Sequence, residues 1–488
     1  MPPKKSKATR VVAVPKAVTM PDRVGKVFVE HVPVDKKTLK RYSFVNSTWR
    51  AAARPRLFTK LVFQARRCQE TREWEWRHGP LGLRSQFSFT TLSVVKEIVF
   101  TSPILQVDNL NRWHMNGNVV LATIISLANC KKMVINAPEF GYGADSQQPL
   151  FTDVARLPQF RRPLERLEIY NLLRFSYDSY IFGIFATFSE LDTLFIQNTS
   201  AKFGERVSTM NNDLPFPKIR NLIIDELVTK HFVDGLLCGK KDNRLASLQS
   251  IDIRLFLEPE MADLKLLGRE AGGSLRNLKL CLYDPISSVL HARPPANIRQ
   301  ADLISKHLFS LLFFSLLTAN LTAERFGSEF WNPMIDWDLF TNLEDLTVYS
   351  ELCTGTTVEQ YLPLATMPSM TGLLKNLAKS KEVCKSAQNP LRLTLELRVV
   401  DPYHTNYLVE YCKNTLWKQL KTILVDLRRN AAIRLQHVTI KLCGKIDLAN
   451  ADRVKQATLV LNKGIRDLGL DFVEGPIVVA TPVIFPMY

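Results

Sequence analysis

The residues that commonly do chemistry are scattered along this chain rather than gathered at catalytic spacings. None of the eight histidines forms a His-Glu-x-x-His pair, and Gly-x-Ser-x-Gly and Gly-x-Gly-x-x-Gly are absent from the sequence. Asp336 and Asp338 flank Trp337 and could imitate a pair of catalytic carboxylates, but we interpret them as part of a surface loop. The sequence therefore predicts no enzyme and no cofactor.

The eight cysteines are spaced too widely for a metal or disulfide framework. None forms a Cys-x-x-Cys pair, so zinc is not predicted, and reduced thiols in a cytoplasmic or nuclear protein are expected. The first 20 residues lack the apolar core of a secretory signal. The most apolar run, at 308–317, is much shorter than the roughly 20 residues needed to cross a bilayer, so we expect a buried helix and no membrane contact.

Positive charge is concentrated near the start of the chain. The formal net charge is +17, and residues 1–60 carry 15 Lys and Arg against Asp22, Glu30 and Asp35. The remainder is close to balanced, which argues against repeats that grip a nucleic acid. Residues 1–20 have the composition of a disordered basic tail, in which Lys4, Lys5 and Lys7 could alternatively form a nuclear import signal.

One phrase organises the middle of the chain: apolar, two residues, apolar, one residue, apolar. Its first positions lie 27, 28, 29 and 27 residues apart. The five copies are Leu164-Leu167-Ile169, Leu191-Leu194-Ile196, Ile219-Leu222-Ile224, Leu248-Ile251-Ile253 and Leu275-Leu278-Leu280. Such a period is typical of a leucine-rich repeat, in which each unit must stack on its neighbours to bury its apolar face.

The phrase continues with looser spacing on both sides of these five copies. Further matches begin at Val95, Cys130, Leu343 and Leu435. The Asn or Cys that usually follows the phrase is missing, so we predict an irregular array over residues 61–470, with an extended lid at 471–488. The alternative is an ordinary α/β domain with evenly spaced parallel strands.

The residues between the apolar positions should point away from the core, because side chains alternate along a strand. Stacking would then align three rows of them on the concave side of the array. These residues are Arg166, Glu168, Tyr170, Thr193, Phe195, Gln197, Asn221, Ile223, Asp225, Ser250, Asp252, Arg254, Asn277, Lys279 and Cys281. Tyr170, Phe195 and Ile223 are apolar or aromatic on successive strands, which predicts a protein-binding surface. The alternative is that a C-terminal segment covers them.

Residues 21–60 predict a small all-helical module. Val24, Val27 and Phe28 recur at helical spacing before Pro33, and a second helix is expected from about Lys36 to Ala52. Leu39, Tyr42, Val45 and Trp49 would form one apolar stripe along it. A module of this size usually needs a partner to cover such a stripe.

The same residues carry a resemblance to the F-box. The matching segments are Met20-Pro21-Asp22-Arg23-Val24, Val27-Phe28, His31-Val32-Pro33, Leu39, Ser43-Phe44-Val45, Trp49-Arg50 and Leu57-Phe58. Asn46 stands where Cys is common in that family. The alternative is a helical hairpin that only packs on the first repeat.

An F-box followed by leucine-rich repeats resembles the substrate-recognition subunits of SCF ubiquitin ligases, in the style of divergent fungal members. The resemblance implies that a Skp-type adaptor and a cullin ligase are partners and that the repeats hold a protein substrate. It implies adaptor contacts at Pro21, Val24, Leu39, Val45, Trp49 and Phe58. Two other classes stay open: a repeat scaffold without ubiquitylation, and a nuclear basic protein that touches nucleic acid through residues 1–60.

Overall fold

The structure is a computed structural model of the whole chain. It describes residues 35–67, 74–76, 92–101, 129–136, 139–140, 161–170, 174–175, 184–197, 216–225, 245–255, 258–282, 335–352, 367–399, 415–444 and 472–480, with isolated positions at 27, 29, 127, 455, 459, 462–463, 466 and 469–470.

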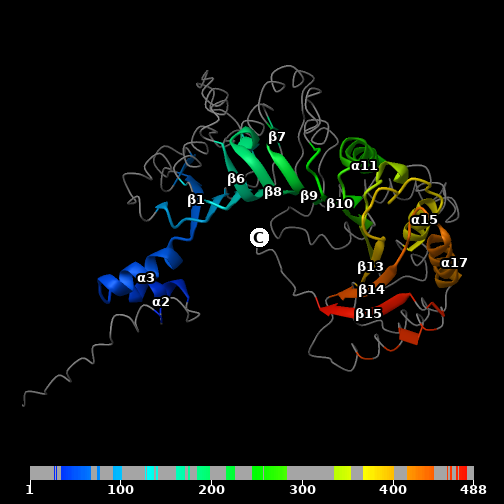
Figure 1. Cartoon of the computed structure of the whole chain (residues 1–488). Helices are drawn as coiled ribbons and strands as arrows, with labels where there is room; N and C mark the ends of the chain where they lie inside the picture. The colour runs from blue at the N-terminus through cyan, green and yellow to red at the C-terminus, as the bar shows by residue number, and fades with distance from the viewer. Residues whose placement is uncertain are drawn as a thin grey trace, which may run out of the picture.

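Most of the described strands form one long open sheet, whose order follows the chain except at the edge, where the second strand lies outside the first (Figure 1). The first half contains β1 (Lys60–Arg67), β2 (Trp74–Trp76), β3 (Glu97–Thr101), β4 (Lys132–Asn136), β6 (Arg162–Tyr170), β8 (Phe188–Gln197) and β9 (Lys218–Asp225). The second half contains β10 (Ser250–Leu255), β11 (Asn277–Leu282), β12 (Asp345–Leu352), β13 (Arg392–Val399), β14 (His437–Gly444) and β15 (Val473–Ala480). Short strands β5 (Glu139–Phe140) and β7 (Arg174–Phe175) pair separately. All neighbours in the long sheet are parallel except β2, which pairs antiparallel with β1 at the edge.

The apolar phrase sets the register of this sheet. Its middle position is directly paired from strand to strand, for example Leu167 with Leu194, Leu194 with Leu222, and Ile251 with Leu278. These side chains are buried in one continuous core. A parallel sheet needs its apolar side covered, and in the second half the described helices supply this cover.

Helices cover the outer side of the second half of the curved sheet. They are α11 (Glu258–Ala271), α15 (Met367–Ala378) and α17 (Thr415–Arg429), and Figure 1 places them outside the arc. Their buried leucines, such as Leu267, Leu373 and Leu424, join the core cluster of the strands. The other face of the sheet is therefore the inner, concave face, as the sequence predicted. The sequence prediction of an α/β fold with a parallel sheet is confirmed.

Side chains just before the strands link neighbouring units. Asn129 donates to the Ser93 carbonyl at 2.8 Å, and Ser274 donates to the Leu248 carbonyl at 2.8 Å. Ser247 and Asn342 make the same kind of bond to preceding units. These residues stand one position before the phrase, so the inter-unit polar contacts lie before the strands rather than after them.

The N-terminal helices form a hairpin with its own small core. Helix α2 (Lys36–Tyr42) and helix α3 (Ser47–Leu57) bury Leu39, Trp49 and Ala53 against Val29. The prediction of a single helix from Lys36 to Ala52 is wrong, because a turn separates the two helices before Asn46 caps α3.

Two further expectations change at the end of the array and outside it. Residues 473–480, predicted as part of a lid, instead form β15, which pairs with β14 and extends the sheet. The predicted basic tail at 1–20 and the helix at 308–317 lie outside the described residues. Among the helices that the structure describes, none combines the length and apolar character needed to cross a membrane.

Candidate functional site

The concave face presents the residues that lie between the core positions. Its middle row runs from Glu168 through Phe195, Ile223 and Asp252 to Lys279, each directly paired with the next. The sequence thus predicted correctly which side chains share a row. Most side chains in these rows are half-buried. Glu168 and Cys281 are buried, however, so the expectation that these two side chains face solvent is wrong.

Glu168 is buried because three neighbouring side chains bind its carboxylate. Arg166 Nε donates to it at 2.5 Å, Lys132 Nζ lies 2.9 Å away, and the Tyr170 hydroxyl donates at 3.1 Å. Burial alone would raise the pKa of Glu168, but the hydrogen bonds from Lys132 and Arg166 outweigh it and lower the pKa. The carboxylate therefore stays ionised and holds both cations on the concave face.

Two aromatic residues continue this cluster onto the next strand. The Tyr170 and Phe195 rings lie 5.2 Å apart, and the Arg166 guanidinium lies 5.8 Å from the Phe195 centroid. The structure therefore brings together Arg166, Glu168, Tyr170 and Phe195, as the row prediction required. Lys132 was missed, although alignment of the phrases places it beside Arg166.

A second charged network lies further along the concave face. Lys279 Nζ lies 3.9 Å from Asp252 and 3.4 Å from Glu396, and Lys441 Nζ lies 3.5 Å from Glu396. Burial lowers the pKa of Lys279, but Asp252, Cys281 and Glu396 more than offset this and raise it. The network is balanced in charge.

The remaining predicted substrate residues divide into two groups. Thr193, Gln197, Asn221 and Ser250 are half-buried on the same face, and Asn277 is exposed. Asp225 and Arg254 lie in β9 and β10, but their side chains fall outside the part that the structure describes.

The residues predicted to contact an adaptor have different environments in the hairpin. Leu39 and Trp49 are buried in the hairpin core, where the Trp49 ring meets the Tyr42 ring edge-on at 5.2 Å. Val45 is 58% exposed, and the adjacent Phe44 is 71% exposed.

The remaining predicted adaptor residues are Phe58, Pro21 and Val24. Phe58 caps the C-terminus of α3 and is half-buried. Phe58, Leu61 and Phe63 form a further copy of the apolar phrase. This copy lies one unit before the first one that the sequence analysis identified, at Val95. Pro21 and Val24 lie outside the described residues.

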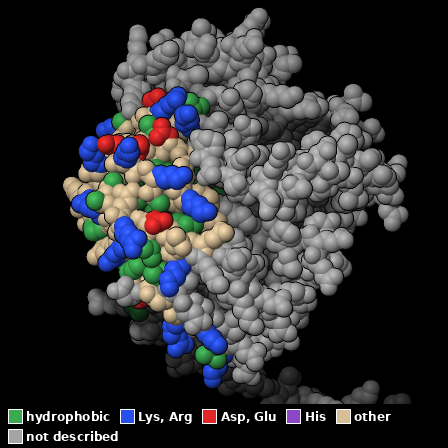
Figure 2. All heavy atoms as spheres, turned by 90° about the vertical axis from the view of Figure 1, so that its right-hand side faces the viewer, with side chains coloured by type: hydrophobic (Ala, Val, Ile, Leu, Met, Phe, Trp, Pro, Cys, Tyr) green, Lys and Arg blue, Asp and Glu red, His purple; other side chains and the backbone are tan. Residues whose placement is uncertain are grey.

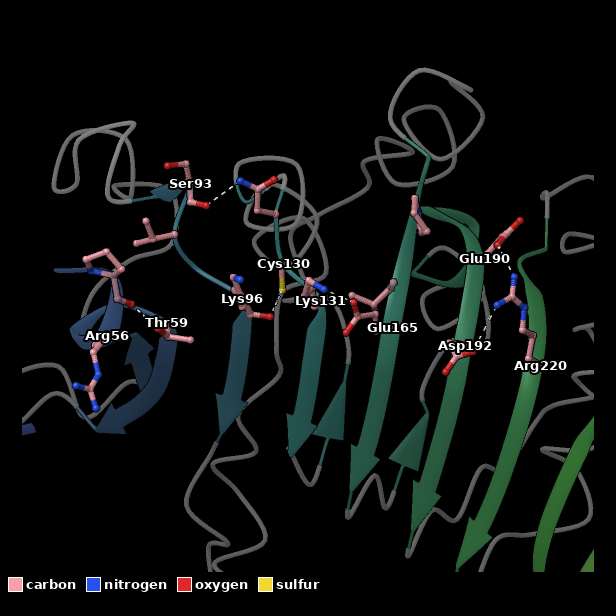
Figure 3. A pocket seen from close by; sticks show the side chains of 15 residues that line it. Arg56, Thr59, Ser93, Lys96, Cys130, Lys131, Glu165, Glu190, Asp192 and Arg220 are labelled. Atoms are coloured by element: carbon pink, nitrogen blue, oxygen red, sulfur yellow. Dashed lines mark hydrogen bonds and ion pairs between the residues drawn. The ribbon is translucent and has the colours of Figure 1, made fainter. Parts of the chain in front are cut away.

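A groove of about 950 Å³ lies where the hairpin meets the array (Figure 3). Arg56 and Thr59 at the end of the hairpin line it together with residues at the starts of several strands. Lys131 pairs with Glu165, and Arg220 lies 3.3 Å from Glu190. Sequence reasoning missed this groove because its lining comes from six segments far apart in the chain.

The groove does not contain an activated nucleophile. Burial raises the pKa of the Cys130 thiol to about 11, only partly offset by Arg162. Cys130 Sγ lies 3.1 Å from the Lys132 carbonyl oxygen, and the lining includes no histidine to act as a base.

The acidic pair that might have imitated a catalytic site has a structural role. Asp338 accepts hydrogen bonds from the Lys381 and Glu382 amides, each at 2.8 Å, and from the Ser380 hydroxyl. It thereby orders the turn after α15, while Asp336 is exposed. Over the described ranges, no group of three or more potential metal ligands comes together.

The comparisons with known proteins assign no family to this chain. No family model matches the sequence, and the search of curated proteins finds no match.

Proposed function

We propose that this chain is a substrate-recognition subunit of an SCF-type ubiquitin ligase. In this proposal the helical hairpin is an F-box that binds a Skp-type adaptor, and the curved array is a leucine-rich-repeat solenoid that holds a protein substrate. The observation that carries the proposal is a hairpin with a core of its own, set at one end of a long open array and exposing two adjacent large apolar residues.

The exposed pair, Phe44 and Val45, marks the surface that a partner would cover. Both lie in the turn between α2 and α3 while the apolar residues of the helices point inward. Large apolar side chains beside each other at a surface indicate an interaction site, and aromatic residues contribute strongly when buried by a partner.

The division of the chain explains how such a subunit would act. One end would hold the ligase and the concave face would hold the substrate, so transfer would be favoured by proximity alone. The described part of the concave face offers ion pairs and half-buried apolar side chains to such a substrate.

Co-purification tests the proposal. A Skp-type adaptor should co-purify with the full chain, and replacing both Phe44 and Val45 with Asp should abolish its capture. Val62→Asp is the matched control, because Val62 is an exposed apolar residue on β1 rather than on the hairpin. Equal capture by the parent and the double variant would contradict the proposed docking surface.

A second candidate function, polyanion binding, is favoured by the outer face around α15 and α17. Figure 2 shows Lys and Arg side chains outnumbering Asp and Glu on this side. Lys375, Lys379, Lys421 and Arg429 are exposed there. Binding of a nucleic-acid duplex that falls steeply with salt, and is lost when these lysines are replaced by Glu, would support this candidate.

A further inference from the structure

The middle row of the concave face changes character along the array. Across six neighbouring strands, β1 to β9, it is apolar apart from one position. Its members there are Val62, Val99, Val134, Glu168, Phe195 and Ile223, each directly paired with the next. Val62 is 49% exposed, Val99, Phe195 and Ile223 are half-buried, and Val134 and Glu168 are buried. We name these six residues the apolar row.

The same row is polar in the second half of the sheet. It continues through Asp252, Lys279, Thr347, Thr394 and Thr439. There the ion pairs of Lys279 and Lys441 with Asp252 and Glu396 use two cations and two carboxylates. The two halves of the concave face therefore offer different surfaces on the same backbone.

Glu168, the one charged residue of the apolar row, is surrounded by more positive than negative charge. Lys132 and Arg166 both bind Glu168, so this cluster has two cations and one carboxylate. Arg166 also lies over the Phe195 ring. A second carboxylate or a phosphate placed here would balance the charge and form charge-assisted hydrogen bonds.

We propose that the apolar row binds an extended acidic peptide segment of the substrate, with apolar side chains on the row and one anionic group at Lys132 and Arg166. Neighbouring strands lie about 4.8 Å apart, so six strands span about 24 Å, the length of about seven residues of extended chain. Thr101, Asn136 and Gln197 flank the row and can hydrogen-bond to a peptide backbone. This inference rests on the proposed function, in which the array holds the substrate.

Peptide binding to the full chain tests this inference. The probes are labelled nine-residue peptides that alternate apolar and polar residues and carry Glu, phosphoserine, Gln or Lys at the centre. We expect the Glu or phosphoserine peptide to bind about tenfold tighter than the Gln peptide, which corresponds to about 1.4 kcal/mol. The stronger of the two anionic peptides identifies the anion as a carboxylate or a phosphate.

Three variants locate the binding on the apolar row. Phe195→Lys should abolish peptide binding, whereas Thr394→Lys, at an equivalent position in the polar half, should leave it unchanged. Lys132→Gln should remove most of the preference for an anionic centre while binding of the Gln peptide persists, because the apolar contacts stay. Hydrogen exchange of the sheet amides should be unchanged in each variant, which separates lost binding from lost folding.

Several outcomes would overturn the inference. One is an equal loss of binding in Phe195→Lys and Thr394→Lys, and another is the absence of any preference between the Glu and Lys peptides. If only a chain ending at Ala480 binds peptide, the row is covered by residues 481–488 and the proposed occupant is wrong. Adaptor capture measured on the same samples is independent: captured adaptor without peptide binding defeats this inference alone, and peptide binding without adaptor defeats the proposed ligase function.

Discussion

The Asn46 side chain accepts a hydrogen bond from the backbone N–H of Trp49 at 2.9 Å, which caps the first turn of α3. Asn46 itself has an extended backbone, so the chain turns before the helix begins. This one contact explains why two helices form where a continuous stripe predicted one. It also gives Asn46 a structural role at the start of α3.

Removing that cap should loosen α3 locally. We expect Asn46→Ala to destabilise the hairpin by about 1 kcal/mol and to speed hydrogen exchange at the first amides of α3. Asn46→Asp is the control, because Asp keeps an accepting oxygen at the same place. Equal exchange in the parent and in Asn46→Ala would show that the cap contributes nothing.

Replacing Glu168 should reveal the charge cluster through its pH dependence. The folded pKa lies below the ordinary value of 4.5, so the ionised carboxylate stabilises the fold above that pH, and this contribution is lost as pH falls through the folded pKa. Glu168→Gln should therefore lower the free energy of unfolding at pH 7 by about 1–3 kcal/mol, with the difference shrinking below pH 4.5.

The control for this experiment lies on the same strand. Glu165 pairs with Lys131 at the surface, where an ion pair contributes little. Glu165→Gln should change unfolding much less at either pH in denaturant titrations. A Glu168→Gln effect that is the same at pH 7 and at low pH would contradict the linkage.

Two adjacent glycines after α11 should respond differently to the same substitution. A Cβ on Gly272 would overlap the backbone oxygens of Leu339 and Gly268, whereas Gly273 has no neighbouring heavy atom within 4 Å of such a Cβ. Gly272→Ala should cost about 1–3 kcal/mol or more through forced backbone shifts, and Gly273→Ala should stay within about 0.5 kcal/mol. Thermal unfolding of the two variants measures the contrast, and equal melting temperatures would contradict the close packing of α11 on Leu339.

Two buried cysteines should resist alkylation. Burial raises the pKa of Cys130 from 9.0 to about 11 and that of Cys384 to about 12. Because the thiolate is the nucleophile, each should react at pH 8 at least about a hundredfold more slowly in the folded chain than in denaturant. Peptide mass spectrometry after timed labelling measures both rates, and fast labelling of either thiol in the folded chain would contradict its burial.

The periodic part of the fold is predictable from local sequence. The phrase around Leu167, Leu194 and Leu222 gives both the strands and their register, because one face of every unit must be buried on the next. The three concave rows follow from the same register and the alternation of side chains.

Other features depend on long-range contacts that a single unit does not show. The burial of Glu168 requires Lys132, which lies on the strand before it and 36 residues earlier in the chain. The groove is another such feature, because its lining comes together only when the hairpin and the starts of several strands are assembled. The turn before Asn46 was not predicted, because only four residues separate the two helices. Across them the apolar spacing still fits one continuous helix, and this hides the capping role of Asn46.

The most direct test of the central claim is a binding titration of a purified Skp-type adaptor against the full chain. We expect the adaptor to bind the full chain saturably, with a dissociation constant in the micromolar range or tighter. Val45→Asp should weaken it by about thirtyfold or more, as expected for a residue that carries about 2 kcal/mol of an interface, while Val62→Asp leaves it unchanged. No binding to the parent chain, or equal binding to parent and Val45→Asp with the hairpin folded, would contradict the account.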